Sequence, residues 1–275
     1  MSLKINRPPI LFLLLTILLF STAAAASSYQ YLRLGDKTDS TATPIAGTAM
    51  MGGGKDLDEA FRWLCKKANG GDFLVLRARG DDDYNSYVNG MCRLNSVATL
   101  IIPDLAAAQD PAVADIIRHA GVVFIAGGNQ ARYVEFWKGT PVEDAINANV
   151  ASGKPIGGTS AGLAVLAEFA YGCLKDKEDD NDLASTDVLP NPYPERVTLV
   201  RDFLNVPYLE NTLPTATSLS ATAWGGLWDF LRAWCRTAGR KGRARLRSTK
   251  SLLSWSNRTA KVQQWGPDTV PISCK

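Results

Sequence analysis

The sequence predicts a three-layer α/β domain built on a mostly parallel sheet. From about residue 46, short apolar runs alternate with segments whose apolar residues recur at helical spacing. The runs are continuously apolar, which is typical of strands that helices cover on both faces. Hydrophobic residues make up 46% of the 275-residue chain, enough for one sizeable core.

The expected elements follow one another as βα units. The first helix, over residues 57–67, places Leu57, Phe61 and Leu64 on one face. Later helices are expected to start at 84–90 and to span 111–119, 136–151 and 161–169. Strands are expected at residues 73–76, 97–102, 122–126 and 155–157.

Three Gly-rich or polar turns fall at the ends of expected strands. They lie at residues 52–54, 127–130 and 158–162. Open α/β sheets bind their ligands at the carboxyl ends of the strands, where these turns are expected. The sequence therefore predicts that the three turns converge on one site.

The turn at 158–162 reads Gly-Thr-Ser-Ala-Gly. This G-x-S-x-G pattern between a strand and a helix is that of a nucleophile elbow, which exposes a serine hydroxyl above the sheet. It predicts acyl transfer, in which Ser160 Oγ attacks a carbonyl and backbone N–H groups such as that of Ala161 stabilise the oxyanion. The alternative is an ordinary tight turn, since Gly, Ser and Ala are common there.

The other two turns are candidates for substrate or oxyanion binding. Glycines such as Gly128 and Gly53 allow close backbone approach to a ligand, and the Gln130 side chain can donate and accept hydrogen bonds. Plain strand-end turns are the alternative. The G-x-G-x-x-G pattern of dinucleotide sites is absent, so we expect no cofactor.

The elbow has no obvious base. His119 is the only histidine, and a serine nucleophile ordinarily needs one. His119 closes the helix at 111–119 just before a strand, so we expect it at the amino-terminal side of the sheet, in a structural role at a helix C-terminus. The five cysteines have no metal-ligand spacing, so we expect no metal site, and any disulfide pairing among them stays open.

Residues 1–26 are predicted to be a secretory signal peptide. Lys4 and Arg7 precede an apolar run at 10–20, which small residues follow at 21–26. The run is short for a transmembrane helix, although an uncleaved anchor is the alternative. We therefore expect a secretory protein, extracellular or vacuolar, with no stable membrane anchor after cleavage.

Four motifs resemble the cyanophycinase-like serine peptidases of family S51, and the resemblance looks closest to plant secretory members. They are Gly-Gly-Asn-Gln at 127–130, Pro-Ile-Gly-Gly-Thr-Ser-Ala-Gly at 155–162, Asn-Pro-Tyr at 191–193 and Arg-Val-Thr-Leu at 196–199. The resemblance implies a class I glutamine-amidotransferase-like (flavodoxin-like) fold over residues 28–213. It also implies serine hydrolysis of acidic dipeptides or β-aspartyl-arginine bonds, that is, of a peptide or isopeptide bond next to an aspartyl residue.

The resemblance implies a role for individual residues as well. Ser160 matches the nucleophile and Gln130 the substrate-binding glutamine, while Gly53 and Gly128 lie in the oxyanion-side turns. Glu168, on the helix expected after the elbow, is a candidate for the third triad member. The implied partner is a peptide or dipeptide substrate, with no nucleic acid, and a homodimer stays open.

The resemblance ends where the composition changes. Residues 214–275 hold 11 basic and two acidic residues and five of the seven tryptophans: Trp224, Trp228, Trp234, Trp255 and Trp265. Family members continue at this point with a segment of the type I-T-D-S-H-F-V-x-R-D-R-M-G-R, whose His is the base and whose Asp and Arg residues bind substrate.

A shifted reading frame accounts for this change. In that frame the codons for 214–218 permit D-S-H-F, those for 221–226 permit D-R-M-G-R, and those for 233–238 and 248–265 permit further family-like stretches. We therefore predict that residues 214–275 are a frameshifted, poorly ordered tail that does not pack on the sheet. The alternative is a genuine basic, Trp-rich tail that binds nucleic acid or a membrane.

The expected function is thus serine-type peptidase activity, in a chain whose translation lacks the base. A catalytically impaired homologue that binds substrate without turnover is one alternative. An amidotransferase-like binding module is another, disfavoured because such elbows usually carry cysteine.

Overall fold

A computed structural model describes residues 29–171, 198–210 and 212–214. It also describes the backbones of three short strands, β9 (Arg243–Arg247), β10 (Leu252–Ser254) and β11 (Thr269–Ser273). The predicted signal peptide, the motif at 191–193 and the five tail tryptophans lie outside the described residues.

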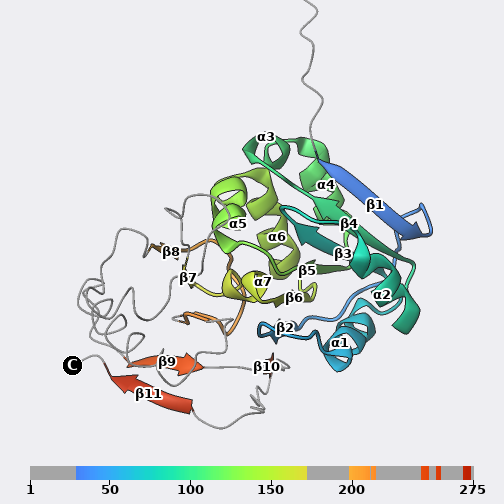
Figure 1. Ribbon diagram of the computed structural model, residues 1–275. Coiled ribbons are helices and arrows are strands. Elements are labelled where there is room, and N and C mark those ends of the chain that lie inside the picture. The colour runs from blue at the N-terminus through green and yellow to red at the C-terminus, as the bar shows by residue number, and fades with distance from the viewer. Residues whose placement is uncertain are drawn as a thin grey trace, which may run out of the picture.

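Seven strands form the central sheet, in the order β1-β4-β3-β5-β6-β2-β10 (Figure 1). The five inner strands pair in parallel, and the two edge strands, β1 on β4 and β10 on β2, are antiparallel. This confirms the predicted mostly parallel sheet. The strands not yet located are β1 (Gln30–Gly35), β2 (Thr48–Met51), β3 (Asp72–Arg77), β4 (Ser96–Ile101), β5 (Val122–Ile125) and β6 (Ile156–Thr159).

Helices cover both faces of this sheet and complete the three layers (Figure 1). On one face lie α1 (Asp58–Ala68) and α2 (Asp83–Met91). The other face carries α3 (Leu105–Ala108), α4 (Pro111–His119), α5 (Gln130–Trp137), α6 (Pro141–Ala151) and α7 (Ala161–Ala164).

Strand β3 shows why the strands read as continuous apolar runs. Phe73 and Val75 belong to the core cluster under α1 and α2, whereas Leu74 and Leu76 belong to the cluster on the opposite face. Successive side chains of a strand point to opposite faces, so a strand covered on both sides needs apolar residues at every position.

The helix at 111–119 begins and ends as predicted. Asp110 caps it by accepting a hydrogen bond from the Ala112 N–H at 2.8 Å, and Pro111 occupies its first turn. The prediction of a single helix at 136–151 is wrong, because Gly139 adopts a φ of +72° and the chain turns there. The hydroxyl of Thr140 then caps α6, accepting from the Val142 N–H at 3.2 Å.

Several elements escaped the sequence analysis. Among them are β1, α3, the antiparallel pair of β9 and β11, and the antiparallel pair formed by β7 (Phe169–Tyr171) and β8 (Leu199–Arg201). The expectation that no part of the tail packs on the sheet is wrong for Leu252–Ser254. These residues pair with β2 as β10, opposite positions 48–50. An exposed sheet edge offers unpaired backbone groups that an added strand can satisfy.

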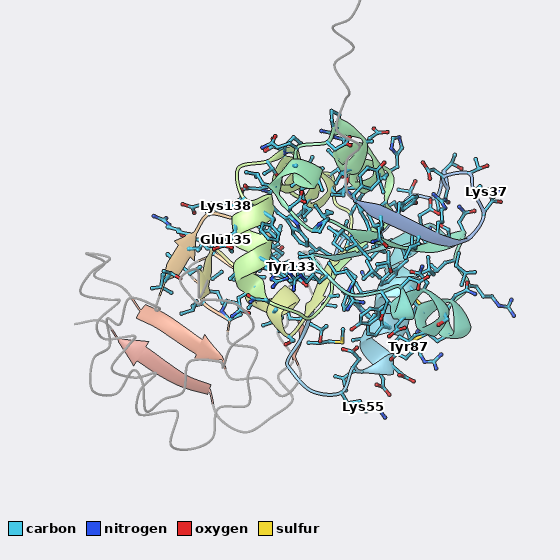
Figure 2. All side chains as sticks on the ribbon, turned by 45° about the horizontal axis from the view of Figure 1, so that its top comes forward. Lys37, Lys55, Tyr87, Tyr133, Glu135 and Lys138 are labelled. Atoms are coloured by element: carbon cyan, nitrogen blue, oxygen red, sulfur yellow. A yellow bond between two sulfur atoms is a disulfide. The ribbon has the colours of Figure 1, made fainter. Side chains whose placement is uncertain are left out.

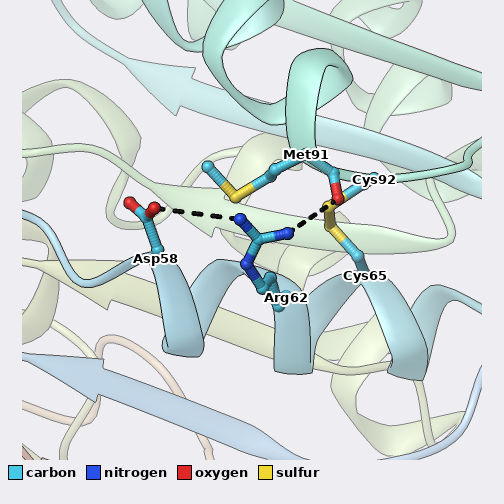
Figure 3. The surroundings of a disulfide bond; sticks show 5 residues. All are labelled: Asp58, Arg62, Cys65, Met91 and Cys92. Carbon is cyan, nitrogen blue, oxygen red and sulfur yellow. Dashed lines mark hydrogen bonds and ion pairs between the residues drawn. A yellow bond between two sulfur atoms is a disulfide. The ribbon is translucent and has the colours of Figure 1, made fainter.

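A disulfide joins Cys65 of α1 to Cys92, the residue that follows α2 (Figure 3). The Arg62 side chain bridges the same junction by donating to the Met91 carbonyl at 3.3 Å. The two helices on this face of the sheet are therefore linked covalently, a pairing that the sequence left open. Within the described residues, no helix combines the length and the apolar character needed to cross a membrane.

Candidate active site

Ser160 sits at a sharp turn between the end of β6 and the start of α7, the strand–turn–helix context that the sequence predicted. Its backbone has a φ of 51° and a ψ of −119°. A residue with a side chain adopts such a conformation only at a cost of about 1–3 kcal/mol, and such strain is common at active sites. Ser160 therefore has the backbone of a nucleophile elbow.

The two glycines of the pattern allow α7 to pass very close to the sheet. A Cβ atom on Gly162 would lie 2.6 Å from the carbonyl carbon of Ile125 and would overlap its oxygen. A Cβ on Gly158 would lie 2.6 Å from the carbonyl carbon of Gly162. The G-x-S-x-G spacing is thus a packing requirement of the turn.

The elbow backbone is held on both sides of Ser160. The Ser160 N–H donates to the Met51 carbonyl at 3.1 Å, and the Ser160 carbonyl accepts from the Ala164 N–H at 3.0 Å. The Ser160 N–H is therefore engaged with β2 and does not face an oxyanion. The next N–H, that of Ala161, opens α7, where a helix supplies no acceptor. This position suits the expected oxyanion donor.

The sheet order brings the three turns together. Strand β6 lies between β5 and β2, with Thr159 opposite Met51 and Gly158 opposite Ile125. The turn at 52–54 and the turn at 127–130 therefore flank the elbow. A Cβ built on Gly127 would lie 3.4 Å from Ser160 Cβ, which confirms the predicted convergence.

The turn at 127–130 leads directly into α5. Asn129 caps this helix by accepting from the Ala131 N–H at 2.8 Å, which makes half-buried Gln130 the first helical residue. Gly128 has a φ of +153°, and a Cβ there would lie 2.9 Å from the Tyr133 hydroxyl oxygen. The positive φ favours glycine at this position, and the close approach of Tyr133 adds to that preference.

Tyr133 supports this turn from below, a role that the sequence analysis missed. Its hydroxyl lies within hydrogen-bond distance of two carbonyls, Ala126 at 2.9 Å and Gly127 at 3.0 Å. Figure 2 shows Tyr133 on the inner side of α5, with Glu135 and Lys138 on the outer side. Burial raises the pKa of Tyr133, so the hydroxyl stays a donor. Its place three residues after Gln130, one helical turn away, was the available signal.

On the other side of the elbow, Asp56 connects the turn at 52–54 to Thr159. The Thr159 hydroxyl donates to one carboxylate oxygen of Asp56 at 3.1 Å, and Tyr84 of α2 donates to the other at 2.7 Å. Burial and the hydrogen bond to Asp56 both raise the pKa of Tyr84. Nothing in the linear sequence joins these three residues, so they also escaped prediction.

His119 lies at the other end of the sheet, as predicted. It lines a pocket of about 240 Å³ together with Asp72 and Ser96, the first residues of β3 and β4. The strands are parallel, and their register places Ser160 about six residues beyond the level of Asp72, roughly 20 Å away along the strand direction. The His119 Nδ1 instead contacts the Asp115 carbonyl at 2.8 Å within its own helix. His119 therefore cannot serve Ser160 as a base.

Hydrogen bonds and an ion pair hold the side chain of Asp72 in that pocket. Burial by itself raises the pKa of its carboxyl, but hydrogen bonds from the Ser40 N–H and from the side chains of Ser96 and Asn95 outweigh burial and lower it. Arg33 adds an ion pair at 3.1 Å. This network fixes the loop before β2 to the amino-terminal end of the sheet.

The helix expected at 161–169 is shorter than predicted, since α7 ends at Ala164. Glu168 therefore lies beyond the helix, next to β7. Its carboxylate pairs with Arg201 of β8 at 2.8 Å, and this pair fixes its position. In the described part of the chain, no group of three or more His, Cys, Asp or Glu residues could hold a metal ion.

A strained serine elbow between two Gly-rich turns is the arrangement of a serine hydrolase, and the family comparison agrees. Residues 46–186 match the model of Peptidase family S51. The chain belongs to this family. Members of peptidase family S51 are serine-type peptidases, so the chain is a hydrolase by family.

Comparisons with individual proteins give less than the family comparison. No curated protein matches the chain. Among solved structures, the chain is similar to the crystal structure of a peptidase from an acI-B1 Actinobacterium, with 16% identity and a TM-score of 0.45. The alignment covers 67% of this chain and 75% of that one.

Proposed function

We propose that this member of family S51 is a cyanophycinase-like serine peptidase of the plant secretory type. It hydrolyses a peptide or isopeptide bond next to an aspartyl residue through a serine acyl-enzyme. The observation that carries the proposal is the strained backbone of Ser160 at the carboxyl end of β6, flanked by turns on both neighbouring strands.

Each site residue has a chemical task in this reaction. Ser160 Oγ attacks the scissile carbonyl, and its proton passes to a base and then to the leaving amine. The Ala161 N–H and the turns that contain Gly53 and Gly128 stabilise the oxyanion, an effect of about 3 kcal/mol per donor. Gln130, at the start of α5, hydrogen-bonds the substrate.

The base is proposed to be encoded in another frame. The only histidine of the chain, His119, lies at the wrong end of the sheet, and the family's histidine segment is expected where the basic tail begins. We propose that a frameshift near residue 213 produced residues 214–275. Sequencing the transcript across the codons for residues 211–226 tests this, since an uninterrupted frame that encodes the tail as written contradicts it.

A fluorophosphonate probe tests the role of Ser160. The chain as written is expected to label weakly or not at all, because a serine without its base loses most of its reactivity. A frame-restored version is expected to label at Ser160, and its Ser160→Ala variant is not. Mass spectrometry of the labelled peptide is the measurement. Strong labelling of the chain as written would show that another group acts as the base.

A catalytically impaired homologue is the second candidate. The position of His119 favours it if the tail is genuine, because the oxyanion site can persist without a base. It predicts that peptides bind to the chain as written and that the transcript has no shifted frame.

We also propose a secretory location, outside the cell or in the vacuole. The disulfide between Cys65 and Cys92 supports it, because such bonds form and persist in oxidising compartments. The N-terminal sequence pattern points the same way.

A further inference from the structure

We infer that Asp56 is a positioning residue for the nucleophile and acts through the hydroxyl of Thr159. The inference rests on the proposed function, because it concerns what orients Ser160. Asp56 lies between the turn at 52–54 and the start of α1, where it is half-buried. Its two carboxylate oxygens hold different partners, the Thr159 hydroxyl at 3.1 Å and the Tyr84 hydroxyl at 2.7 Å.

The strained backbone of the elbow needs restraints from outside the turn, of which the Met51 carbonyl of β2 supplies one. A non-glycine residue at a φ of 51° stays there only where its surroundings hold it. The hydrogen bonds of Ser160 to Met51 and Ala164 involve backbone atoms alone. The side-chain restraint closest to Ser160 in the chain is therefore the hydroxyl of Thr159.

Thr159 connects the end of β6 to the turn that follows β2. It is the last residue of β6 and is 4% exposed. Its hydroxyl donates to Asp56 and lies 3.4 Å from the Gly52 carbonyl oxygen. A buried hydroxyl that loses its acceptor is costly. This contact thus fixes the entrance of the elbow to the turn that follows β2.

Tyr84 holds Asp56 in place from α2. Its ring packs against Phe61 and Phe124, with centroid separations of 5.7 and 5.6 Å, so the hydroxyl has a fixed direction. The raised pKa of the Tyr84 hydroxyl keeps it a donor. A continuous path of contacts therefore runs from α2 through Asp56 and Thr159 to Ser160.

The chain contains a matched control for this path. Tyr87, one turn further along α2, donates to Asp58 at 2.6 Å. Both bonds join a tyrosine of α2 to an aspartate near the start of α1, but Asp58 is exposed on the first turn of α1 and its carboxylate pairs with Arg62 rather than with the elbow. Loss of this bond removes a tyrosine–carboxylate hydrogen bond, more exposed than that of Tyr84, without touching the path to Ser160.

The test uses a thiol reporter in the full chain. Ser160→Cys replaces the hydroxyl with a group that iodoacetamide alkylates without help from a base. The alkylation rate at position 160, read by mass spectrometry on the corresponding peptide, reports how the elbow presents its side chain. Thermal unfolding of each variant is measured alongside, so that a loss of stability is seen separately.

In this background, Thr159→Val is expected to slow alkylation about fivefold, because the turn relaxes when its side-chain restraint is lost. A fivefold change corresponds to about 1 kcal/mol. Thr159→Ser keeps the hydroxyl and is expected to stay within about twofold of the reporter chain, since one hydrogen bond is preserved. Tyr84→Phe is expected to slow alkylation, and Tyr87→Phe is not.

The inference is overturned if Thr159→Val and Thr159→Ser react alike, or if Tyr84→Phe and Tyr87→Phe change the rate equally. All four substitutions are neutral, so none alters the charge near the thiol. Failure of the proposed peptidase activity is seen separately, as absent fluorophosphonate labelling of Ser160 in the frame-restored chain. The thiol readout does not depend on that outcome.

Discussion

Gly162→Ala is expected to lower the free energy of unfolding by about 3 kcal/mol or more, the upper range for overpacking a close contact. The added Cβ would overlap the Ile125 carbonyl oxygen and lie 2.7 Å from that of Ala126, and both are backbone atoms that cannot turn away. In a frame-restored chain, labelling of Ser160 is also expected to disappear, because α7 must move off the sheet. Urea denaturation and fluorophosphonate labelling check the two effects.

Gly90→Ala is the matched control. Gly90 is exposed within α2, and no atom lies within 4 Å of its built Cβ. The same substitution there is expected to stabilise the chain by about 0.5–1 kcal/mol, since alanine favours the helix. Equal effects at positions 90 and 162 would contradict the role of Gly162 as a contact point between α7 and the sheet.

Removal of the disulfide is expected to have an effect of similar size. The free energy of unfolding of the Cys65→Ser, Cys92→Ser double variant is expected to be about 3 kcal/mol lower than that of the parent chain. The reason is that the crosslink joins positions separated by 27 residues and restricts the unfolded chain. Urea denaturation of the variant and of the reduced parent chain measures this. Both should lose the same stability.

Arg62→Ala serves as the control for that junction. Arg62 bridges the same two helices (Figure 3) without a covalent bond, and about half of its side chain is exposed. Its loss is expected to cost at most about 0.5 kcal/mol, as for other exposed polar contacts. A double cysteine variant as stable as Arg62→Ala would show that the disulfide adds nothing beyond that junction.

Much of the fold could be predicted because its strands are buried on both faces. The apolar runs around 73–76 and 122–126 stand out for that reason, and the helix at 111–119 carries its own start signal in Asp110 and Pro111. Strand β1 was harder to recognise, because it is an edge strand with half-buried and exposed residues. The break at Gly139 was overlooked although Thr140 and Pro141 give the same kind of start signal for α6 as Asp110 and Pro111 give for the helix at 111–119.

The residues of the site also fall into two groups, those that the sequence reveals and those that only tertiary contacts reveal. Ser160, Gln130, Gly128 and Gly53 could be named from motifs, since each lies in a turn whose local sequence is distinctive. Asp56, Tyr84 and Tyr133 could not, because what they do depends on contacts between elements far apart in the chain. Asp56 is separated from Thr159 by 103 residues.

The sequence by itself determined the α/β class, the nucleophile elbow and the three turns, because local glycine patterns and apolar periodicity depend on backbone sterics and burial alone. Tertiary structure decided which strands are neighbours, and hence that β2 and β5 flank β6 and carry the other two turns to Ser160. It also paired Cys65 with Cys92 and brought Asp56 to Thr159. These outcomes depend on the order of strands in the sheet, which long-range packing determines.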